Sequence, residues 1–324
     1  MAFLVPGNNA AREILPSPLR RRRGSAKSSG PIAKWFMNLL LLALVPACFA
    51  LNPVIGRALA DAFGPASLSV IRWAFSAAIV ALLALSRGEG ERWRAPAGHL
   101  LRVAALGALG MGFCAYAAFE GARTSPATNI ALIYGCTSAF VAAWEIAAGR
   151  QKFTAALVCG IAACLAGVVL IVTRGHPEVL QNLNFTPGDL WATAGMFVFV
   201  TYTVILRRTP AILTALPQFV VMSFGATLAL MPFAGAEIGA RMPVLELWMV
   251  PWLTAAVLAA GIGAFLGYNI ALKRNGPVLT SAALTLTPMY AAGLAMVLIG
   301  EQLAWYHGAA LVLVVVGLLL VNKA

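Results

Sequence analysis

The residues that could bind a solute lie in the middle of long apolar stretches of the chain. They are hydroxyl, amide and aromatic side chains, and an unpaired amide or hydroxyl is costly in hydrocarbon. Such side chains should face the protein interior or a water-filled cavity, although any one tyrosine could instead be an interface anchor or a packed side chain. We predict one central cavity lined by Asn52, Trp73, Tyr116, Tyr134, Thr137, Tyr202, Tyr268 and Thr285.

Two helical segments place polar groups at a weak point of the backbone. Pro288 lies about 16 Å of helical rise beyond Pro277, near the middle of a span. There it removes one backbone donor and frees the carbonyl of Leu284, next to Thr285. Thr137 occupies the equivalent place in the first half of the chain. Interrupted helices in matching positions of two halves indicate a transporter site, whereas a simple kink is the alternative.

Few ionisable side chains fall inside the apolar stretches. Arg72 stands about 12 Å into its helix, where it can snorkel in part or pair with an anionic group. The 3 histidines lie at predicted helix ends or in loops, and the 5 cysteines show no metal-binding or pairing spacing. Phosphate-binding loops, His-Glu-x-x-His motifs and Asp-rich motifs are absent from the sequence. The sequence therefore predicts no metal, no cofactor and no enzyme activity.

The composition of the chain indicates that it lies in a lipid membrane. Hydrophobic residues make up 61% and charged residues 10% of the sequence, and the mean hydropathy is +0.86, which lies outside the usual range of soluble domains. The net charge of +12 would suggest nucleic acid in a soluble protein, but the basic residues form short clusters between apolar stretches. We expect membrane lipid and small solutes as partners, and no nucleic acid.

The elements that must position the polar residues are membrane-spanning helices. A bilayer core of about 30 Å needs about 20 apolar residues per helix. Dividing the chain at charges and at Pro/Gly clusters predicts an all-α membrane protein of ten transmembrane helices. The predicted spans are 33–57, 64–86, 99–121, 126–148, 153–173, 188–207, 214–234, 247–272, 277–299 and 303–322, and the longest connections are 87–98, 174–188 and 235–246.

Basic residues are distributed unevenly between the two sides that these spans define. Most of the 23 Lys and Arg residues lie in the N-terminal tail and in alternate connections. The intervening connections hold one each, namely Arg57, Arg123, Arg174 and Arg241. The positive-inside rule therefore predicts a multi-pass protein of the bacterial inner (plasma) membrane with both termini in the cytoplasm. Residues 1–32 are expected to form a disordered basic cytoplasmic tail, and a signal peptide with a lipoprotein-like site at 45–48 is the alternative.

An internal repeat appears when the chain is laid over itself at one constant offset. The matched pairs are Gly110 with Gly261, Gly112 with Gly263, Arg123 with Arg274, Pro126 with Pro277 and Gly149 with Gly300. The glycines of the third and eighth spans are expected to let helices approach closely. We predict one five-helix repeat over 33–174 and a second over 188–322. Because five is odd, the second repeat must enter the membrane from the opposite side.

These features resemble a drug/metabolite transporter of the EamA type, over residues 33–322. The residues that carry the resemblance are Pro65 to Arg72-Trp73, Ser125-Pro126-Ala127, and Leu286-Thr287-Pro288 with Gly300-Glu301. The first half departs from the pattern, with Thr137 in place of proline and Arg150 in place of glutamate. Asn52-Pro53 and the tyrosine-rich spans are most similar to YddG-type bacterial exporters of aromatic and other amino acids. The resemblance implies a central cavity open alternately to each side, with peripheral fifth and tenth helices.

The favoured interpretation is a secondary transporter that exports or exchanges amino acids, aromatic ones included, across the inner membrane by alternating access. A drug/metabolite carrier of another substrate class, such as a metabolite or an organic cation, is the alternative. A membrane-embedded enzyme is disfavoured because no nucleophile, metal site or acid pair is present. A receptor or scaffold is a further alternative that the sequence leaves open.

Overall fold

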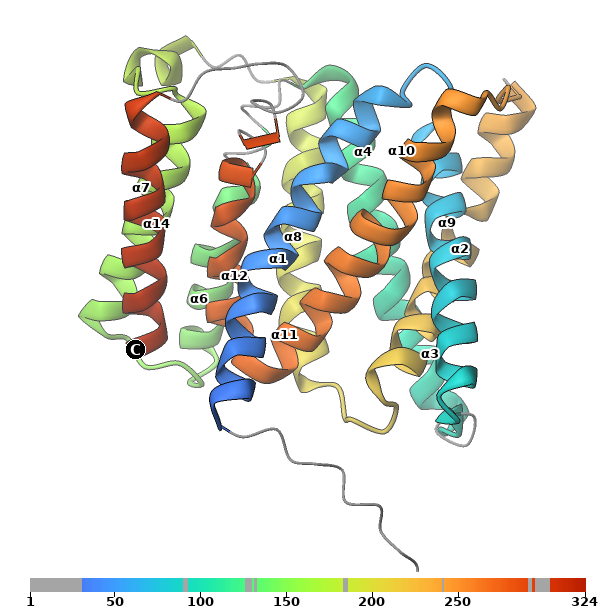
Figure 1. Ribbon diagram of the computed structural model, residues 1–324, viewed down its shortest axis with the longest axis horizontal. Coiled ribbons are helices and arrows are strands. Elements are labelled where there is room, and N and C mark those ends of the chain that lie inside the picture. Colours follow the sequence, from blue (N-terminus) through green and yellow to red (C-terminus); the bar gives the residue numbers. More distant parts are fainter. Residues whose placement is uncertain are drawn as a thin grey trace, which may run out of the picture.

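The computed structural model describes residues 31–89, 93–125, 130, 133–182, 186–240, 242–290, 293–294 and 304–324. Within these ranges every regular element is a helix (Figure 1). The predicted tail lies outside the described residues except for its last two, which open the first helix. The elements are α1 Pro31–Ala58, α2 Pro65–Ser86, α3 Ala97–Gly107, η2 Ala108–Phe113, α4 Cys114–Thr124, α6 Thr137–Ala147, α7 Ala155–Val172, η3 Pro177–Asn182, α8 Pro187–Arg208, α9 Ala215–Ala240, η4 Leu247–Met249, α10 Val250–Ala255, η5 Ala256–Leu266, α11 Gly267–Asn275, α12 Pro277–Ala283, η6 Leu284–Leu286 and α14 Trp305–Lys323.

Seven helices in the described part of the chain are long and apolar enough to cross a membrane. They are Phe36–Gly56, Pro65–Ser86, Ala97–Thr124, Pro187–Arg208, Ala215–Ala240, Leu247–Asn275 and Trp305–Lys323. Two shorter apolar helices cover Ile133–Ala147 and Ala155–Leu170. Large apolar side chains such as Leu82 (68% exposed) and Leu101 (73% exposed) cover the outside of the bundle, and a surface of this kind is stable in lipid and not in water.

The helices pack in pairs that join the first half of the chain to the second. α2 packs along α9, and α7 lies beside α14 at one edge of the bundle (Figure 1). η2 and α4 pack on α8, and α1 packs on η5 and α11. α1 begins and α14 ends at the same end of the bundle (Figure 1). Every one of these contacts is therefore made across the boundary between the two predicted repeats.

Small residues allow the closest of these approaches. A Cβ atom built on Gly317 of α14 would lie 2.6 Å from the carbonyl oxygen of Gly160 in α7, which is too close for any side chain. A Cβ atom on Gly107 would overlap the backbone of Met222 in α9, and one on Gly110 would overlap the ring of Tyr202 in α8. The packing role predicted for the glycines of the third span is thus what the structure shows at Gly107 and Gly110, and Gly317 and Gly160 add a close approach that was not predicted.

Both halves contain a helix that widens into π-helical turns. η2 covers Ala108–Phe113 and η5 covers Ala256–Leu266, and the matched glycines Gly110 and Gly261 lie one in each. Such segments interrupt the regular ladder of backbone hydrogen bonds and are frequent at functional sites. The two irregular segments occupy equivalent positions of the sequence repeat.

The two predicted weak points of the backbone are also interrupted. The chain makes a turn at Cys136, directly before α6, where the amide of Ala139 donates to the carbonyl of Cys136 over three residues. In the second half, α12 tightens into η6 at Leu284–Leu286, directly before Thr287 and Pro288. Both interruptions therefore stand beside the threonines expected at mid-span, Thr137 and Thr285.

One boundary differs from the prediction. The seventh span was expected to end at 234 with a loop over 235–246, but α9 continues to Ala240. The added turns include Glu237, whose carboxylate accepts hydrogen bonds from the first turn of α2. This tertiary contact stabilises helix where Gly235 and Gly239 alone would disfavour it.

Candidate functional site

Two hydrogen bonds between α8 and α11 lie in the buried middle of the bundle. The Tyr202 hydroxyl donates to Oδ1 of Asn269 at 2.6 Å, and the hydroxyls of Thr203 and Tyr268 lie 2.7 Å apart. The two tyrosines and Thr203 are at most 1% exposed. Because α8 and α11 carry these residues at facing positions, each buried hydroxyl meets a polar partner instead of lipid.

Aromatic rings from both halves of the chain surround these bonds. Phe49 of α1 lies 5.0 Å from Phe265 of η5, measured between ring centroids, and Phe199 of α8 lies 5.1 Å from Tyr268. Trp73 of α2 meets Phe265 edge-on at 5.0 Å. Tilted and edge-on contacts at these distances are favourable beyond the area they bury. The rings form one continuous cluster, and we call it the aromatic cluster: Phe49, Trp73, Phe199, Tyr202, Phe265 and Tyr268.

An arginine and an asparagine extend this cluster toward α4. Arg72 of α2 donates from Nη1 to Oδ1 of Asn52 in α1 at 2.6 Å. The guanidinium carbon lies 4.4 Å from the ring centroid of Trp73 and 5.1 Å from that of Phe119 in α4. The guanidinium is thus held between two aromatic faces, which attract a cation. Asn52 and Trp73, both predicted lining residues, are joined through Arg72.

Three further predicted residues lie in or next to α6 and α12. Thr137 is buried in α6, and Thr285 is buried in η6, where its hydroxyl donates to the carbonyl of Ala282 at 2.7 Å. The Tyr134 hydroxyl is buried against Gly195 of α8, and no hydrogen-bond partner for it is found among the described residues. Gly195 connects Tyr134 to the main core, because its carbonyl accepts a hydrogen bond from Cys114, which belongs to the same hydrophobic core as the aromatic cluster.

Tyr116 lies apart from these residues. Its ring packs on Trp191 of α8 at 5.6 Å and on Phe233 of α9 at 6.3 Å, measured between centroids, and its side chain is half-buried. The structure therefore joins Asn52, Trp73, Tyr202 and Tyr268 through Arg72 and the aromatic rings. Tyr134 reaches this region through Gly195 of α8, whereas the Thr285 side chain lies beside Cys164 of α7 and Tyr116 is separate from the rest. Sequence reasoning missed Phe49, Phe199 and Phe265, because the sequence does not indicate whether a phenylalanine in an apolar span faces lipid or the protein interior.

A polar groove opens at the end of the bundle where the chain finishes. It has a volume of about 400 Å³ and is lined by the ends of α6, α8, α11 and α14 and the start of α12. Arg150, Arg207 and Asn275 contribute to its wall, and an ion pair at 3.2 Å joins Glu145 of α6 to Arg208 of α8. This ion pair bridges the two halves of the chain at the mouth of the groove.

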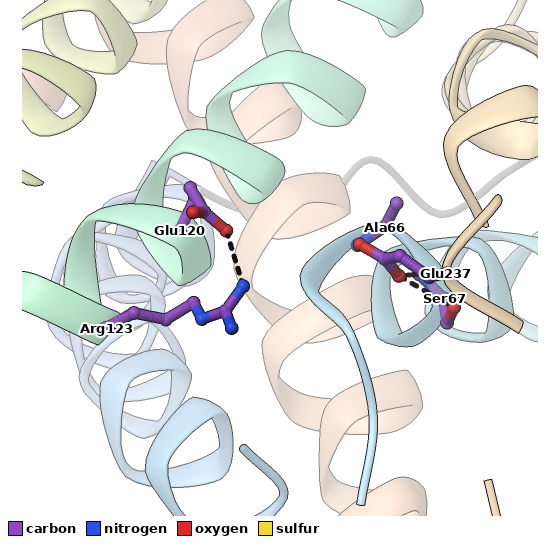
Figure 2. A network of polar contacts seen from close by, with 5 residues as sticks. All are labelled: Ala66, Ser67, Glu120, Arg123 and Glu237. Atoms are coloured by element: carbon purple, nitrogen blue, oxygen red, sulfur yellow. Dashed lines mark hydrogen bonds and ion pairs between the residues drawn. The ribbon is translucent and has the colours of Figure 1, made fainter. Parts of the chain in front are cut away.

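The opposite end of the bundle carries a second contact between the halves (Figure 2). The Glu237 carboxylate of α9 accepts hydrogen bonds from the backbone amides of Ala66 and Ser67 at 3.0 and 2.8 Å, and from the Ser67 hydroxyl at 2.7 Å. These amides open α2, so the carboxylate satisfies free donors and lies at the positive end of the helix dipole. Nearby, Glu120 and Arg123 of α4 form an ion pair of their own at 3.2 Å (Figure 2).

The buried polar groups of this region are suited to binding a small solute. Among the described residues no group of three or more His, Cys, Asp or Glu side chains is placed to hold a metal ion. The buried polar groups are hydroxyls, amides and one guanidinium, next to aromatic faces. Such a set can desolvate, stack on and hydrogen-bond a small solute.

Comparisons with known proteins agree with this description. The model of the EamA-like transporter family matches the chain twice, over residues 36–173 and over residues 186–323. No curated protein matches the chain. A solved structure titled only "Crystal structure of protein" is similar, with 18% sequence identity, a TM-score of 0.69, and coverage of 88% of this chain and 94% of that chain. At this identity the likeness concerns the fold alone.

Proposed function

Because the chain belongs to the EamA-like transporter family, we propose that it is a secondary carrier that exports or exchanges amino acids, aromatic ones included, across the inner membrane by alternating access. Family membership makes it a multi-pass membrane transporter of small molecules. The observation that carries the finer proposal is the aromatic cluster with its buried hydroxyl and amide groups, to which both repeats contribute. Phe49 and Trp73 come from the first repeat, and Phe199, Tyr202, Phe265 and Tyr268 come from the second.

The proposed architecture is ten spans in two inverted repeats of five. The nine apolar helices described and the helix that begins at Pro277 supply one helix for each predicted span. Supporting the inversion, equivalent helices of the two halves pack on each other as α2 with α9 and α7 with α14. The end of α9 at Glu237 contacts the first turn of α2, so this pair is antiparallel, as a pseudo-twofold axis in the membrane plane requires.

The chemistry of the cluster favours a neutral, zwitterionic solute with an apolar or aromatic side chain. Stacking on a tyrosine or tryptophan ring contributes about 0.5–1.5 kcal/mol per contact, which suits the weak binding that a carrier needs for release. Hydroxyl and amide groups supply both donors and acceptors without a strong excess of negative charge. The resemblance to YddG-type exporters points to the same substrates.

Alternating access then requires contacts between the repeats that form and break. The ion pair from Glu145 to Arg208 bridges the repeats at the groove, and the Glu237 contact to α2 does so at the other end. The groove end carries Arg150, Arg207 and Arg208 and is assigned to the cytoplasm by the positive-inside rule. Opening one end while the other stays closed would expose the central cluster to each side in turn.

Counterflow into proteoliposomes tests this function. Vesicles loaded with unlabelled phenylalanine should accumulate labelled phenylalanine only when the purified protein is present. Tyr134→Ala should weaken transport of phenylalanine more than that of threonine, because it removes an aromatic surface. Thr285→Val should impair both, because it removes a polar contact to the backbone shared by all amino acids. Tyr306→Ala, at the start of the peripheral α14, is the matched control and should change neither.

The outcome that refutes the substrate class is equally specific. Vesicles that exchange no amino acid but do exchange a phosphorylated sugar, a nucleotide sugar or an organic cation would show a carrier with other substrates. Vesicles that exchange no solute of any of these classes would argue against a carrier and in favour of a receptor or scaffold.

A further inference from the structure

We propose that Arg72 is the anchor for an anionic group of the transported solute, and that this group is a carboxylate. The inference deepens the proposed function, since it names the part of the substrate that the repeat interface recognises. It starts from the burial of Arg72, which is 1% exposed in the middle of α2. A charged side chain at membrane depth is costly and marks a solute or ion pathway when its partner is not a neighbouring acid.

The hydrogen bonds of Arg72 leave one edge of the guanidinium open. Nη1 is engaged by Oδ1 of Asn52 at 2.6 Å. Nε and Nη2 are buried, and no acceptor for them is found in the described part of the chain. These two nitrogens form the edge that binds both oxygens of a carboxylate in the bidentate geometry preferred by arginine. Asn52 thus fixes the side chain so that the bidentate edge is the one left open.

Several buried donors lie around Arg72, and no partner for them is found among the described residues. Ser69, Arg72, Trp73 and Ser76 share one face of α2, being separated by three and four residues. The Trp73 indole nitrogen and the Ser69 hydroxyl are also buried, and no partner for them is found among the described residues. Buried donors are normally paired, so a set of them in one place favours a ligand that brings acceptor oxygens. An acidic solute group does this, whereas an organic cation does not.

The π-helical segment η5 packs closely against Arg72 and Ser76 of α2. A Cβ atom on Gly261 of η5 would lie 3.3 Å from Cγ of Arg72 and 2.5 Å from the Ser76 hydroxyl. The Ser76 hydroxyl donates to the carbonyl of Val257 in the same π-helical segment at 3.1 Å. Arg72 therefore stands where α2 of the first repeat meets the irregular helix of the second. Movement of one repeat against the other changes access to it.

The first test separates the carboxylate from the rest of the ligand. Inhibition of phenylalanine counterflow is measured with phenylalanine itself and with its methyl ester, which lacks the anionic group. In the native protein phenylalanine should bind more tightly than the ester. Arg72→Gln should weaken the binding of phenylalanine, measured as inhibition of counterflow, by about 30-fold or more, the usual effect of removing one partner of a buried charge pair. Inhibition by the ester should be almost unchanged. Arg72→Lys should bind phenylalanine with intermediate affinity, because lysine keeps the charge but lacks the two parallel N–H donors of the guanidinium.

Folding is monitored in the same samples. Arg72→Gln should retain the melting temperature of the native protein or raise it, because it removes a buried charge. Arg123→Gln, an exposed arginine paired with Glu120, is the matched control and should leave both inhibitors unchanged. If Arg72→Gln lowers the melting temperature and weakens both inhibitors alike, Arg72 is a structural residue and the proposal is overturned.

A second measurement keeps the anchor testable if the protein exchanges no amino acid. The melting temperature of the full-length protein in detergent is measured with benzoate, with inorganic phosphate and with an anionic phospholipid. Stabilisation by benzoate that disappears in Arg72→Gln supports the carboxylate anchor even though the amino acid assignment has failed. Arg72-dependent stabilisation by phosphate alone or by phospholipid alone, or by none of the three, overturns it.

Discussion

The contact between Glu237 and α2 offers the sharpest energetic prediction. Removing the carboxylate in Glu237→Ala leaves the amides of Ala66 and Ser67 and the Ser67 hydroxyl without their acceptor. Loss of a helix N-cap costs about 0.5–2 kcal/mol. Glu237 is half-buried but accepts three hydrogen bonds, so we expect the upper part of that range, about 1–2 kcal/mol.

The nearby ion pair of Glu120 with Arg123 supplies a matched control. Glu120 and Glu237 lie in the same region of the molecule (Figure 2). Glu120 is paired within one helix, with an Arg123 side chain that is 60% exposed. Pairs of this kind contribute about 0.2–0.5 kcal/mol. Glu120→Ala should therefore destabilise the protein several-fold less than Glu237→Ala.

The assay is reversible unfolding in mixed micelles, titrated with a denaturing detergent and followed by helical circular dichroism. A double-mutant cycle with Ser67→Ala should show a coupling energy of about 0.5–1.5 kcal/mol to Glu237, because either single variant removes the hydrogen bond between the Ser67 hydroxyl and the Glu237 carboxylate. Equal effects of Glu237→Ala and Glu120→Ala, with no coupling to Ser67, would refute the assignment of Glu237 as the cap of α2.

Three further outcomes follow from the packing and the charge distribution. Gly317→Ala should force α7 and α14 apart and cost about 1–3 kcal/mol, whereas Gly308→Ala in the same helix, with open space around it, should be neutral or stabilising in the same unfolding assay. Tyr202→Phe should cost about 0.6 kcal/mol and no more than about 1.7 kcal/mol, the average and the largest value for hydrogen bonds between membrane helices, and a variant as stable as the native protein would show that the bond to Asn269 contributes nothing. In a cysteine-free background, Gln181→Cys should react with an impermeant thiol reagent from the periplasm and Lys152→Cys only from the cytoplasm, and the reverse pattern would invert the proposed topology.

The positions of the seven long apolar helices could be predicted from the sequence because lipid imposes a simple rule, whereas the end of the ninth predicted span lies outside the described residues. A backbone in hydrocarbon must satisfy its own hydrogen bonds, so apolar length alone locates the helices. The end of the seventh span escaped this rule. Its last turns, up to Ala240, are rich in glycine, and they are stabilised by the contact of Glu237 with α2, which no local pattern records.

The arrangement of the side chains was less accessible. A helix that is apolar on every side gives no contrast from which to read its buried face. Phe49, Phe199 and Phe265 therefore gave no hint that they meet in one cluster. Tyr116 was expected to line the same cavity as the other tyrosines, but its ring lies between α8 and α9, because mid-span depth says nothing about which neighbour a side chain faces.

The pairing of Asn52 with Arg72 shows where the limit of sequence reasoning lies. α1 ends at Ala58 and α2 begins at Pro65, so the chain reverses direction over a short turn, and both helices pack on η5 more than on each other. Asn52 precedes the turn by about the same helical rise, roughly 10 Å, by which Arg72 follows it, and antiparallel helices bring such residues to one depth. The short turn therefore predicts that Asn52 and Arg72 lie at one depth, but not that they face each other, and only the length of the arginine side chain lets the two groups meet. Which nitrogen the amide engages depends on side-chain rotamers set by Trp73 and Phe119, which pack against the guanidinium. That choice leaves the bidentate edge open for an anion, and it is a property of the folded interface that the order of residues does not contain.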